Sequence, residues 1–324
     1  MRELSVGKND AGQRLDRFLR KAVPGLPDSR LQKYIRTKDI KINGRPAKGD
    51  ARLEEGDVVR LYVPEEFFTA APPKRPAAAS RVPLTVAYED ENILIADKQP
   101  GLLCHDAEGW SPNTLISAIQ AYLREKGEWD PAKENSFAPA LCNRIDRNTG
   151  GLVIAAKNAE ALRIMDEKIR NREIDKTYLC AVVGRPKPPE GRLENQLFKD
   201  AKKNQVYLYN APRPGTVTAV TEYRVLCANG GLSLVECRLI TGRTHQIRAQ
   251  MSYAGWPLLG DGKYGNERKN REYGENKQAL QSYRMKFIFT SDSGILSYLN
   301  GLTVTGSLPG FAEKYFPGRI CREE

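Results

Sequence analysis

The N-terminal segment carries two short stretches in which apolar positions recur at helical spacing. The first stretch has apolar residues at steps of three and four: Leu15, Phe18, Leu19 and Ala22. This spacing is typical of one face of a helix. The second stretch begins after Pro27, where Asp28 or Ser29 is expected to cap a helix that turns Leu31, Tyr34 and Ile35 inward.

Strand patterns follow these helices. Ile40-Lys41-Ile42 alternates apolar and polar side chains, and the Asn43-Gly44 pair after it is a strong signal for a two-residue hairpin. The turn Glu55-Gly56-Asp57 leads into another strand at 58–61. The segment is therefore predicted to combine two helices with a small sheet.

Beyond residue 84 the pattern is richer in strands. We expect strands at 86–88, 92–96, 152–156, 177–183, 217–226, 232–241 and 295–304, and helices at 114–126 and 159–170. The segments 191–215 and 266–277 show no regular pattern and are expected to be loops. A largely antiparallel sheet with helices around it is an α+β fold.

Composition changes between residues 64 and 83, where PEEFFTAAPPKRPAAASRVP is rich in proline and alanine and has no periodicity. Such a segment is expected to be a semi-extended, flexible linker, with Phe67 and Phe68 packing against a neighbouring domain. The predicted organisation is an N-terminal module at 1–63, a linker at 64–83 and a larger domain at 84–324.

The chain of 324 residues has a formal net charge of +11 and a pI near 9.3. This basicity favours a polyanionic partner, although by itself it is weak evidence. No secretory signal and no apolar run of bilayer-spanning length is visible, so we expect a cytoplasmic protein without membrane contact. Six cysteines are scattered without a C-x-x-C pair: Cys104, Cys142, Cys180, Cys227, Cys237 and Cys321. This scatter argues against a zinc site or a disulfide framework.

Basic residues gather on the polar faces of the two N-terminal helices. They are Arg14, Arg17 and Lys21 on the first helix, and Arg30, Lys33 and Arg36 on the second. These cations have a simple alternative role, which is to solvate the helices. Their common position opposite the apolar stripes suits contacts with phosphates.

Residues 143–157, NRIDRNTGGLVIAAK, hold the most informative carboxylate. Asp146 stands between Arg144 and Arg147, ahead of the pair Gly150-Gly151 and an apolar run. Nearby cations stabilise an ionised carboxylate, and paired glycines allow another backbone or a ligand to come close. The alternative for an isolated aspartate in this setting is a surface salt bridge.

A second cluster lies in 239–265, LITGRTHQIRAQMSYAGWPLLGDGKYG. The two segments resemble the signature blocks of the RluA-type pseudouridine synthases, H-R-L-D-x-x-T-S-G and G-R-T-H-Q-I-R followed by G-x-P-x-x-G-D-x-x-Y-G. Lys176-Thr177-Tyr178 matches the family's K-x-Y strand, and 96–101 matches its D-K-P-x-G turn with Gln99 inserted. Four blocks in the family's order make the resemblance specific over residues 84–305.

The N-terminal segment resembles the RNA-binding module first known from ribosomal small-subunit protein four. The matching residues are Arg14-Leu15-Asp16, 31–35, Asn43-Gly44 and Gly56-Asp57. With this resemblance, the six basic residues of the two helices are expected to contact RNA. Together the two resemblances imply an RNA-binding module tethered to a catalytic domain that has a long mixed sheet and a cleft across its middle.

The resemblance implies isomerisation of specific uridines to pseudouridine in structured RNA, in which uracil leaves C1′, rotates and rejoins through C5. No redox change occurs, so neither a metal nor a nucleotide cofactor is expected. Carried over to this chain, Asp146 is the catalytic carboxylate and Arg243 is its partner. Tyr178 stacks on the uracil and is a candidate base for the C5 proton, and Ile247 packs against the uracil. Attack at C1′, attack at uracil C6 and removal of a sugar proton remain open for Asp146.

Four residues depart from the family's blocks: Asn143, Ile145, Gly150 and Gln250 stand where His, Leu, Ser and His are usual. Large-subunit ribosomal RNA is the favoured target, and transfer RNA is the alternative. A catalytically silent RNA-binding or ribosome-assembly factor competes with the enzyme, as does a small-molecule glycosidase, which needs a second carboxylate. His245 is interpreted as a structural donor in a turn rather than an acid–base group. The protein is expected to be a monomer.

Overall fold

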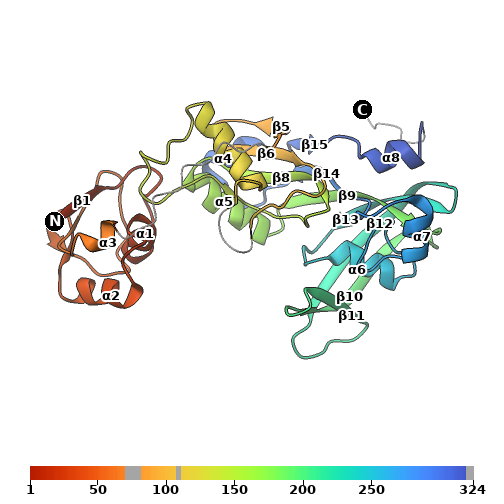
Figure 1. The fold of residues 1–324 in the computed structure, drawn as a ribbon, viewed down its shortest axis with the longest axis horizontal. Helices are drawn as coiled ribbons and strands as arrows, with labels where there is room; N and C mark the ends of the chain where they lie inside the picture. The colour runs from red at the N-terminus through yellow and green to blue at the C-terminus, as the bar shows by residue number, and fades with distance from the viewer. Residues whose placement is uncertain (70–81, 107–110, 319–324) are drawn as a thin grey trace.

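The computed structural model describes residues 1–69, 82–106 and 111–318. A four-stranded antiparallel sheet lies near the N-terminus, and an eleven-stranded mixed sheet runs through the rest of the described chain (Figure 1). The α+β prediction is confirmed.

Residues 1–69, the N-terminal unit, have a hydrophobic core of their own. The small sheet orders its strands as β1 (Arg2–Ser5), β4 (Val58–Leu61), β2 (Ile40–Ile42) and β3 (Arg45–Pro46). Helices α1 (Leu15–Ala22) and α2 (Asp28–Arg36) pack on it. The predicted hairpin is present, and Asn43 and Gly44 both have positive φ, 50° and 79°.

Two details of the N-terminal unit refine the sequence analysis. The predicted cap of α2 is wrong, because Pro27 occupies the N-cap position and Asp28 is already helical, pairing with Arg20 at 2.7 Å. Helix α3 (Glu66–Thr69) occupies the start of the expected linker, and Phe67 and Phe68 pack against the N-terminal core as predicted. The central part of the expected linker, 70–81, lies outside the described residues.

The large sheet is antiparallel except at one pairing. Its order is β11 (Gln205–Tyr209), β10 (Glu190–Asp200), β12 (Val217–Asn229), β13 (Leu232–Leu239), β9 (Ile174–Val183), β14 (Leu280–Phe287), β8 (Gly150–Ala156), β6 (Ile93–Lys98) and β5 (Val86–Glu89). Strand β15 (Thr303–Thr305) pairs with β14, and β7 (Ala140–Leu141) pairs with β8. The exception is the short parallel contact of β14 with β8.

Three predictions of secondary structure beyond residue 84 are wrong. Residues 191–215 form most of β10 and all of β11 rather than a loop, because strands at the sheet edge carry polar side chains on an exposed face. Residues 266–277 contain α7 (Glu267–Tyr273), whose N-terminus is capped by the Asn266 side chain. The expected strand at 295–304 begins as the 3₁₀ helix η1 (Gly294–Leu299).

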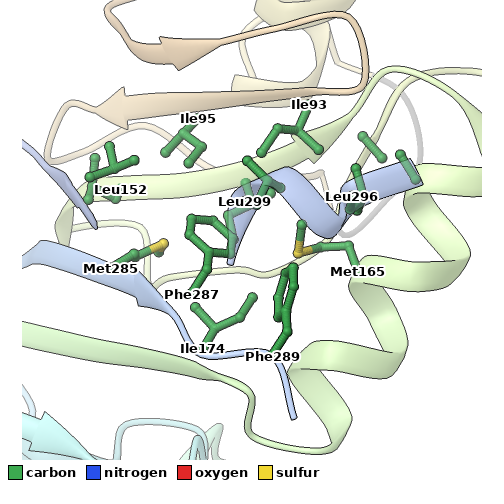
Figure 2. Close-up of a cluster of buried hydrophobic side chains, with 14 residues drawn as sticks. Ile93, Ile95, Leu152, Met165, Ile174, Met285, Phe287, Phe289, Leu296 and Leu299 are labelled. Carbon is green, nitrogen blue, oxygen red and sulfur yellow. The ribbon is translucent and has the colours of Figure 1, made fainter. Parts of the chain in front are cut away.

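Helices cover both faces of the large sheet. Leu152 of β8 lies in the cluster that packs with α5 (Ala159–Arg170) and η1 (Figure 2), and Ile154 belongs to the same cluster. Val153 and Ala155 belong to the cluster that packs with α4 (Leu115–Glu125). Farther along, α6 (Gln246–Tyr253) packs on β9 and β13, and α8 (Gly310–Tyr315) joins a separate cluster with Ala181 of β9. None of the described helices has the length and hydropathy needed to cross a bilayer.

The N-terminal unit docks on the rest of the chain through polar groups. Asp10 is 1% exposed and accepts hydrogen bonds from the side chains of Asn135 and Ser136. Asn9 Oδ1 accepts the backbone N–H of Ala159 at the start of α5. The unit therefore lies against the α4–α5 end of the large domain, at the far end from β10 and β11 (Figure 1).

Candidate active site

Asp146 lies in the loop between β7 and β8, and buried side chains clamp this loop. Lys98 is 1% exposed and its Nζ donates to the carbonyl oxygens of Gln99, Leu102 and Arg147, the last at 3.0 Å. Burial lowers the pKa of Lys98 to about 8. Asn143 Oδ1 accepts the backbone N–H of Ile154 at 2.8 Å. The asparagine that replaces the family's usual histidine thus anchors the loop to β8.

The glycine pair after Asp146 joins the two halves of the large sheet. Gly151 has φ +104° and pairs with Ser282 of β14 at the parallel contact. A Cβ atom there would lie 2.1 Å from the Ser282 carbonyl oxygen. The predicted close approach of another backbone is confirmed, and it brings the Asp146 loop next to β9 and α6.

Arg248, not Arg243, is the ion-pair partner of Asp146. Nη1 of Arg248 lies 2.7 Å from Asp146 Oδ2. Arg243 lies in the loop before α6, where its exposed side chain donates from Nε to the Thr218 carbonyl at 3.3 Å. The predicted Arg243–Asp146 pair is therefore wrong for the described structure, because helix α6 begins only after Arg243 and turns Arg248 inward.

A second carboxylate fixes Arg248. Its Nε and Nη2 donate to the two oxygens of Asp261 at 2.7 and 2.9 Å, a bidentate pair. Asp261 also accepts backbone N–H groups from Lys263 and Tyr264. Burial acts to raise the pKa of Asp261, but the hydrogen bond and charge of Arg248 lower it below its usual value. Sequence reasoning missed this residue, although it is the aspartate of the matched G-D-x-x-Y-G block.

Tyr178 and Ile247 form an apolar wall beside Asp146. Both are buried, belong to one hydrophobic cluster and line the same cleft. Burial raises the pKa of Tyr178 to about 12, with the Ser282 hydroxyl acting in the opposite direction. The phenol is therefore protonated at neutral pH.

Gln246 and Gln250 lock the loop and helix that carry Arg248. Gln246 Oε1 accepts the backbone N–H of Arg243, and its Nε2 donates to the Val220 carbonyl. Gln250 accepts from the Thr221 hydroxyl at 2.7 Å and donates to acceptors on β10 and β12. The glutamine that replaces the family's usual histidine is thus a buried structural residue.

Asp146, Arg248 and their neighbours line a strongly basic cleft of about 1090 Å³. The cleft brings Asp146, Tyr178, Arg243 and Ile247 together, as the sequence blocks predicted. Its other cations are Arg144, Arg147, Arg170, Arg172, Lys176, Lys199, Arg238, Arg248 and Lys263. Such a lining attracts a polyanion and raises its local concentration.

The six predicted RNA contacts lie outside this cleft, on the N-terminal unit. Arg14 precedes α1 and pairs with Asp16 at 2.9 Å. The other five are exposed: Arg17 and Lys21 on α1, and Arg30, Lys33 and Arg36 on α2. Their contact with RNA stays a prediction.

Comparisons with known proteins agree with this geometry. The family model described as RNA pseudouridylate synthase matches residues 92–253. An uncharacterized RNA pseudouridine synthase of Chlorobaculum parvum is 32% identical over 81% of this chain and 78% of its own. Ribosomal large subunit pseudouridine synthase C of Escherichia coli is 30% identical over 88% of both chains.

A solved structure supports the fold. Human RNA pseudouridylate synthase domain containing 4 superposes with a TM-score of 0.55 at 21% identity, covering 70% of this chain and 89% of its own. The family match, the relatives' coverage and the carboxylate-centred basic cleft lead to one assignment: this chain belongs to the RNA pseudouridine synthase family and acts on RNA.

Proposed function

We propose that this protein converts specific uridines of large-subunit ribosomal RNA to pseudouridine, with Asp146 as the catalytic carboxylate. The main observation behind this assignment is a carboxylate, Asp146, that an arginine holds in place at the cleft. Asp146 faces the basic cleft with its side chain 28% exposed, and Arg248 fixes its Oδ2 at 2.7 Å. The ribosomal target is supported by the likeness to the Escherichia coli relative, whose name states the large subunit.

The surroundings of Arg248, Tyr178 and Ile247 favour a particular role for each of them. Arg248 orients Asp146 and compensates its charge, because its own position is fixed by Asp261. Tyr178 and Ile247 present an apolar surface to the uracil, whose faces are exposed once the nucleotide is flipped out. Because its pKa is raised to about 12, Tyr178 is neutral at pH 7. Its main role is therefore to pack against the uracil, and removal of a proton is secondary.

Positively charged side chains away from Asp146 bind the RNA backbone. The cleft cations bind the phosphates around the target uridine, and Arg243 belongs to this group rather than to the catalytic pair. The N-terminal unit adds contacts through the exposed cations of α1 and α2, in the manner of the ribosomal module that it resembles. Phosphate contacts of this kind give affinity and orientation without reading the base sequence.

Mapping pseudouridine in total RNA from cells with and without the gene tests the proposal. The expected result is loss of one or a few sites in large-subunit ribosomal RNA, restored by the wild-type gene and not by Asp146→Asn. Asp175→Asn is a matched control, because Asp175 lines the same cleft but pairs with Arg238. Loss of sites only in transfer RNA would refute the ribosomal target. An unchanged map would refute catalysis and favour a silent RNA-binding factor.

A further inference from the structure

His245 occupies a strained backbone position beside the catalytic carboxylate. It is the N-cap residue of α6 with φ +54°, a left-handed conformation that side-chain-bearing residues seldom adopt. Its side chain is only 8% exposed, and its Nδ1 lies 2.9 Å from the Tyr264 phenol oxygen. Strained residues that their surroundings hold in place tend to cluster at functional sites.

The hydrogen bond between Tyr264 and His245 favours one tautomer of the imidazole. The Tyr264 oxygen accepts the backbone N–H of Val206 at 2.9 Å, so its own hydrogen is available for Nδ1 of His245. With Nδ1 as the acceptor, a neutral imidazole carries its proton on Nε2. Burial lowers the pKa of His245 against the opposing charge of Asp146, which keeps the ring neutral at pH 7.

The donor on Nε2 points toward an acceptor that it does not reach. Nε2 lies 3.8 Å from Asp146 Oδ2, beyond hydrogen-bond distance. Oδ2 accepts one hydrogen bond from Arg248 and has capacity for another. A donor and an acceptor at this separation can both be satisfied by one hydroxyl oxygen about 2.8 Å from each, which accepts from Nε2 and donates to Oδ2.

An internal nucleotide of RNA has one group that fits this requirement. Its 3′ and 5′ oxygens are esterified, and its uracil presents donors and acceptors on different atoms. The 2′-hydroxyl alone both donates and accepts, and it lies on the carbon next to C1′, where the glycosidic bond is broken.

We infer that His245 and Asp146 together bind the 2′-hydroxyl of the target nucleotide, which makes His245 a residue that selects ribose over deoxyribose and sets the position of C1′. This inference rests on the proposed function, because it assumes that a uridine enters the cleft. Oδ2 is then occupied by Arg248 and the 2′-hydroxyl, and Oδ1 is left to face the reacting sugar or base.

The test is a double-mutant cycle that combines a change at His245 with removal of the 2′-hydroxyl from the substrate. The substrate is an RNA stem-loop around the uridine found by mapping. A second stem-loop carries 2′-deoxyuridine at that one position. For the wild-type enzyme, kcat/KM is expected to fall roughly ten- to a hundred-fold on the deoxy substrate, because a hydrogen bond to a charged group is lost. For His245→Ala, the ribo substrate is expected to lose roughly two- to ten-fold in kcat/KM, because a neutral hydrogen bond is lost. The penalty for removing the 2′-hydroxyl should shrink by a similar factor, and the part that remains reflects the hydrogen bond that Asp146 still accepts.

Three further variants keep the inference testable. His245→Gln retains a side-chain donor and should recover part of the penalty for deoxyribose. Tyr264→Phe removes the hydroxyl that favours a proton on Nε2 of His245. It should therefore reduce the penalty for deoxyribose while the imidazole ring stays in place. His105→Ala alters the other histidine of the cleft and should leave the wild-type penalty in place.

An equal penalty for deoxyribose in wild type and in His245→Ala would overturn the inference. A water molecule would then be the group that bridges His245 Nε2 and Asp146 Oδ2. If His245→Ala does not fold, the same comparison with Tyr264→Phe decides. A wild-type enzyme that leaves the ribo substrate unmodified would count against the proposed function instead, so the two failures are distinguishable.

Discussion

Replacing Arg248 by methionine should both destabilise the fold and abolish turnover. Methionine keeps much of the side-chain volume but removes the charge shared by Asp146 and Asp261. Asp261 matters more for stability, because its side chain is fully buried whereas that of Asp146 is 28% exposed. Breaking a buried ion pair by removing one partner costs roughly 3–5 kcal/mol. The two backbone N–H groups on Asp261 remain and favour the lower part of that range.

The penalty should depend on pH in a defined direction. In the wild type the folded-state pKa of Asp261 is lowered, so this residue stabilises the fold above its unfolded pKa near 4, and the stabilisation is lost as pH falls through the folded value. Without Arg248, burial dominates and the folded pKa rises above about 4. The difference in the free energy of unfolding between wild type and variant should therefore be largest near pH 7 and shrink toward pH 4.

Urea denaturation at several pH values measures this difference. Arg243→Met is the matched control, because Arg243 is an exposed arginine of the same cleft, and its change should stay within about 0.5 kcal/mol. Adding Asp261→Asn to Arg248→Met removes the unpaired charge and should restore part of the stability. A loss in Arg243→Met as large as that in Arg248→Met, or a penalty that does not vary with pH, would refute the assignment of the pair.

Other expectations follow from the sheet junction and the N-terminal unit. Gly151→Ala should lower the free energy of unfolding by clearly more than the roughly 1–2 kcal/mol expected for Gly127→Ala, which shares a positive φ but has open space around it; calorimetry compares the two. Changing Arg30, Lys33 and Arg36 to glutamine should reduce the slope of log affinity against log salt by about 2–3 units in a filter-binding titration, and an unchanged slope would contradict phosphate contact by α2. Deleting the N-terminal unit should leave a folded domain that turns over at saturating RNA but has a raised KM, because the docking surface is polar; loss of turnover at saturation would show that the unit supports the chemistry.

Local signals predicted many elements well. Helix α5 was predicted with the bounds that the structure has from its apolar pattern, and the structure adds that the Asn158 side chain caps its N-terminus. Strands β10 and β11 escaped prediction because much of their surface is exposed, so no hydrophobic alternation marks them. β10 forms by pairing with β12, and β11 forms by pairing with β10, and neither contact is encoded locally.

The same limit applies to the cleft. The resemblance of the sequence blocks to those of the family predicted that Asp146, Tyr178 and Ile247 meet, and all three line the cleft. Which arginine reaches Asp146 depends on where α6 begins, and therefore on the left-handed backbone of His245. Sequence spacing alone does not reveal that conformation, so Arg243 and Arg248 could not be told apart.

If α1 and α2 bind RNA phosphates as proposed, the polar docking of the N-terminal unit makes the enzyme sensitive to the shape of its RNA. Asn135 and Ser136 hold the buried Asp10, and together with the contact of Asn9 to α5 they fix how α1 and α2 lie against the rest of the chain. Phosphates gripped by the N-terminal unit and a uridine seated in the cleft must then lie at one separation and one rotation around the RNA helix. A stem one base pair longer is then expected to turn the uridine away from Asp146 even when every base is correct, which gives selectivity a component that no base contact supplies.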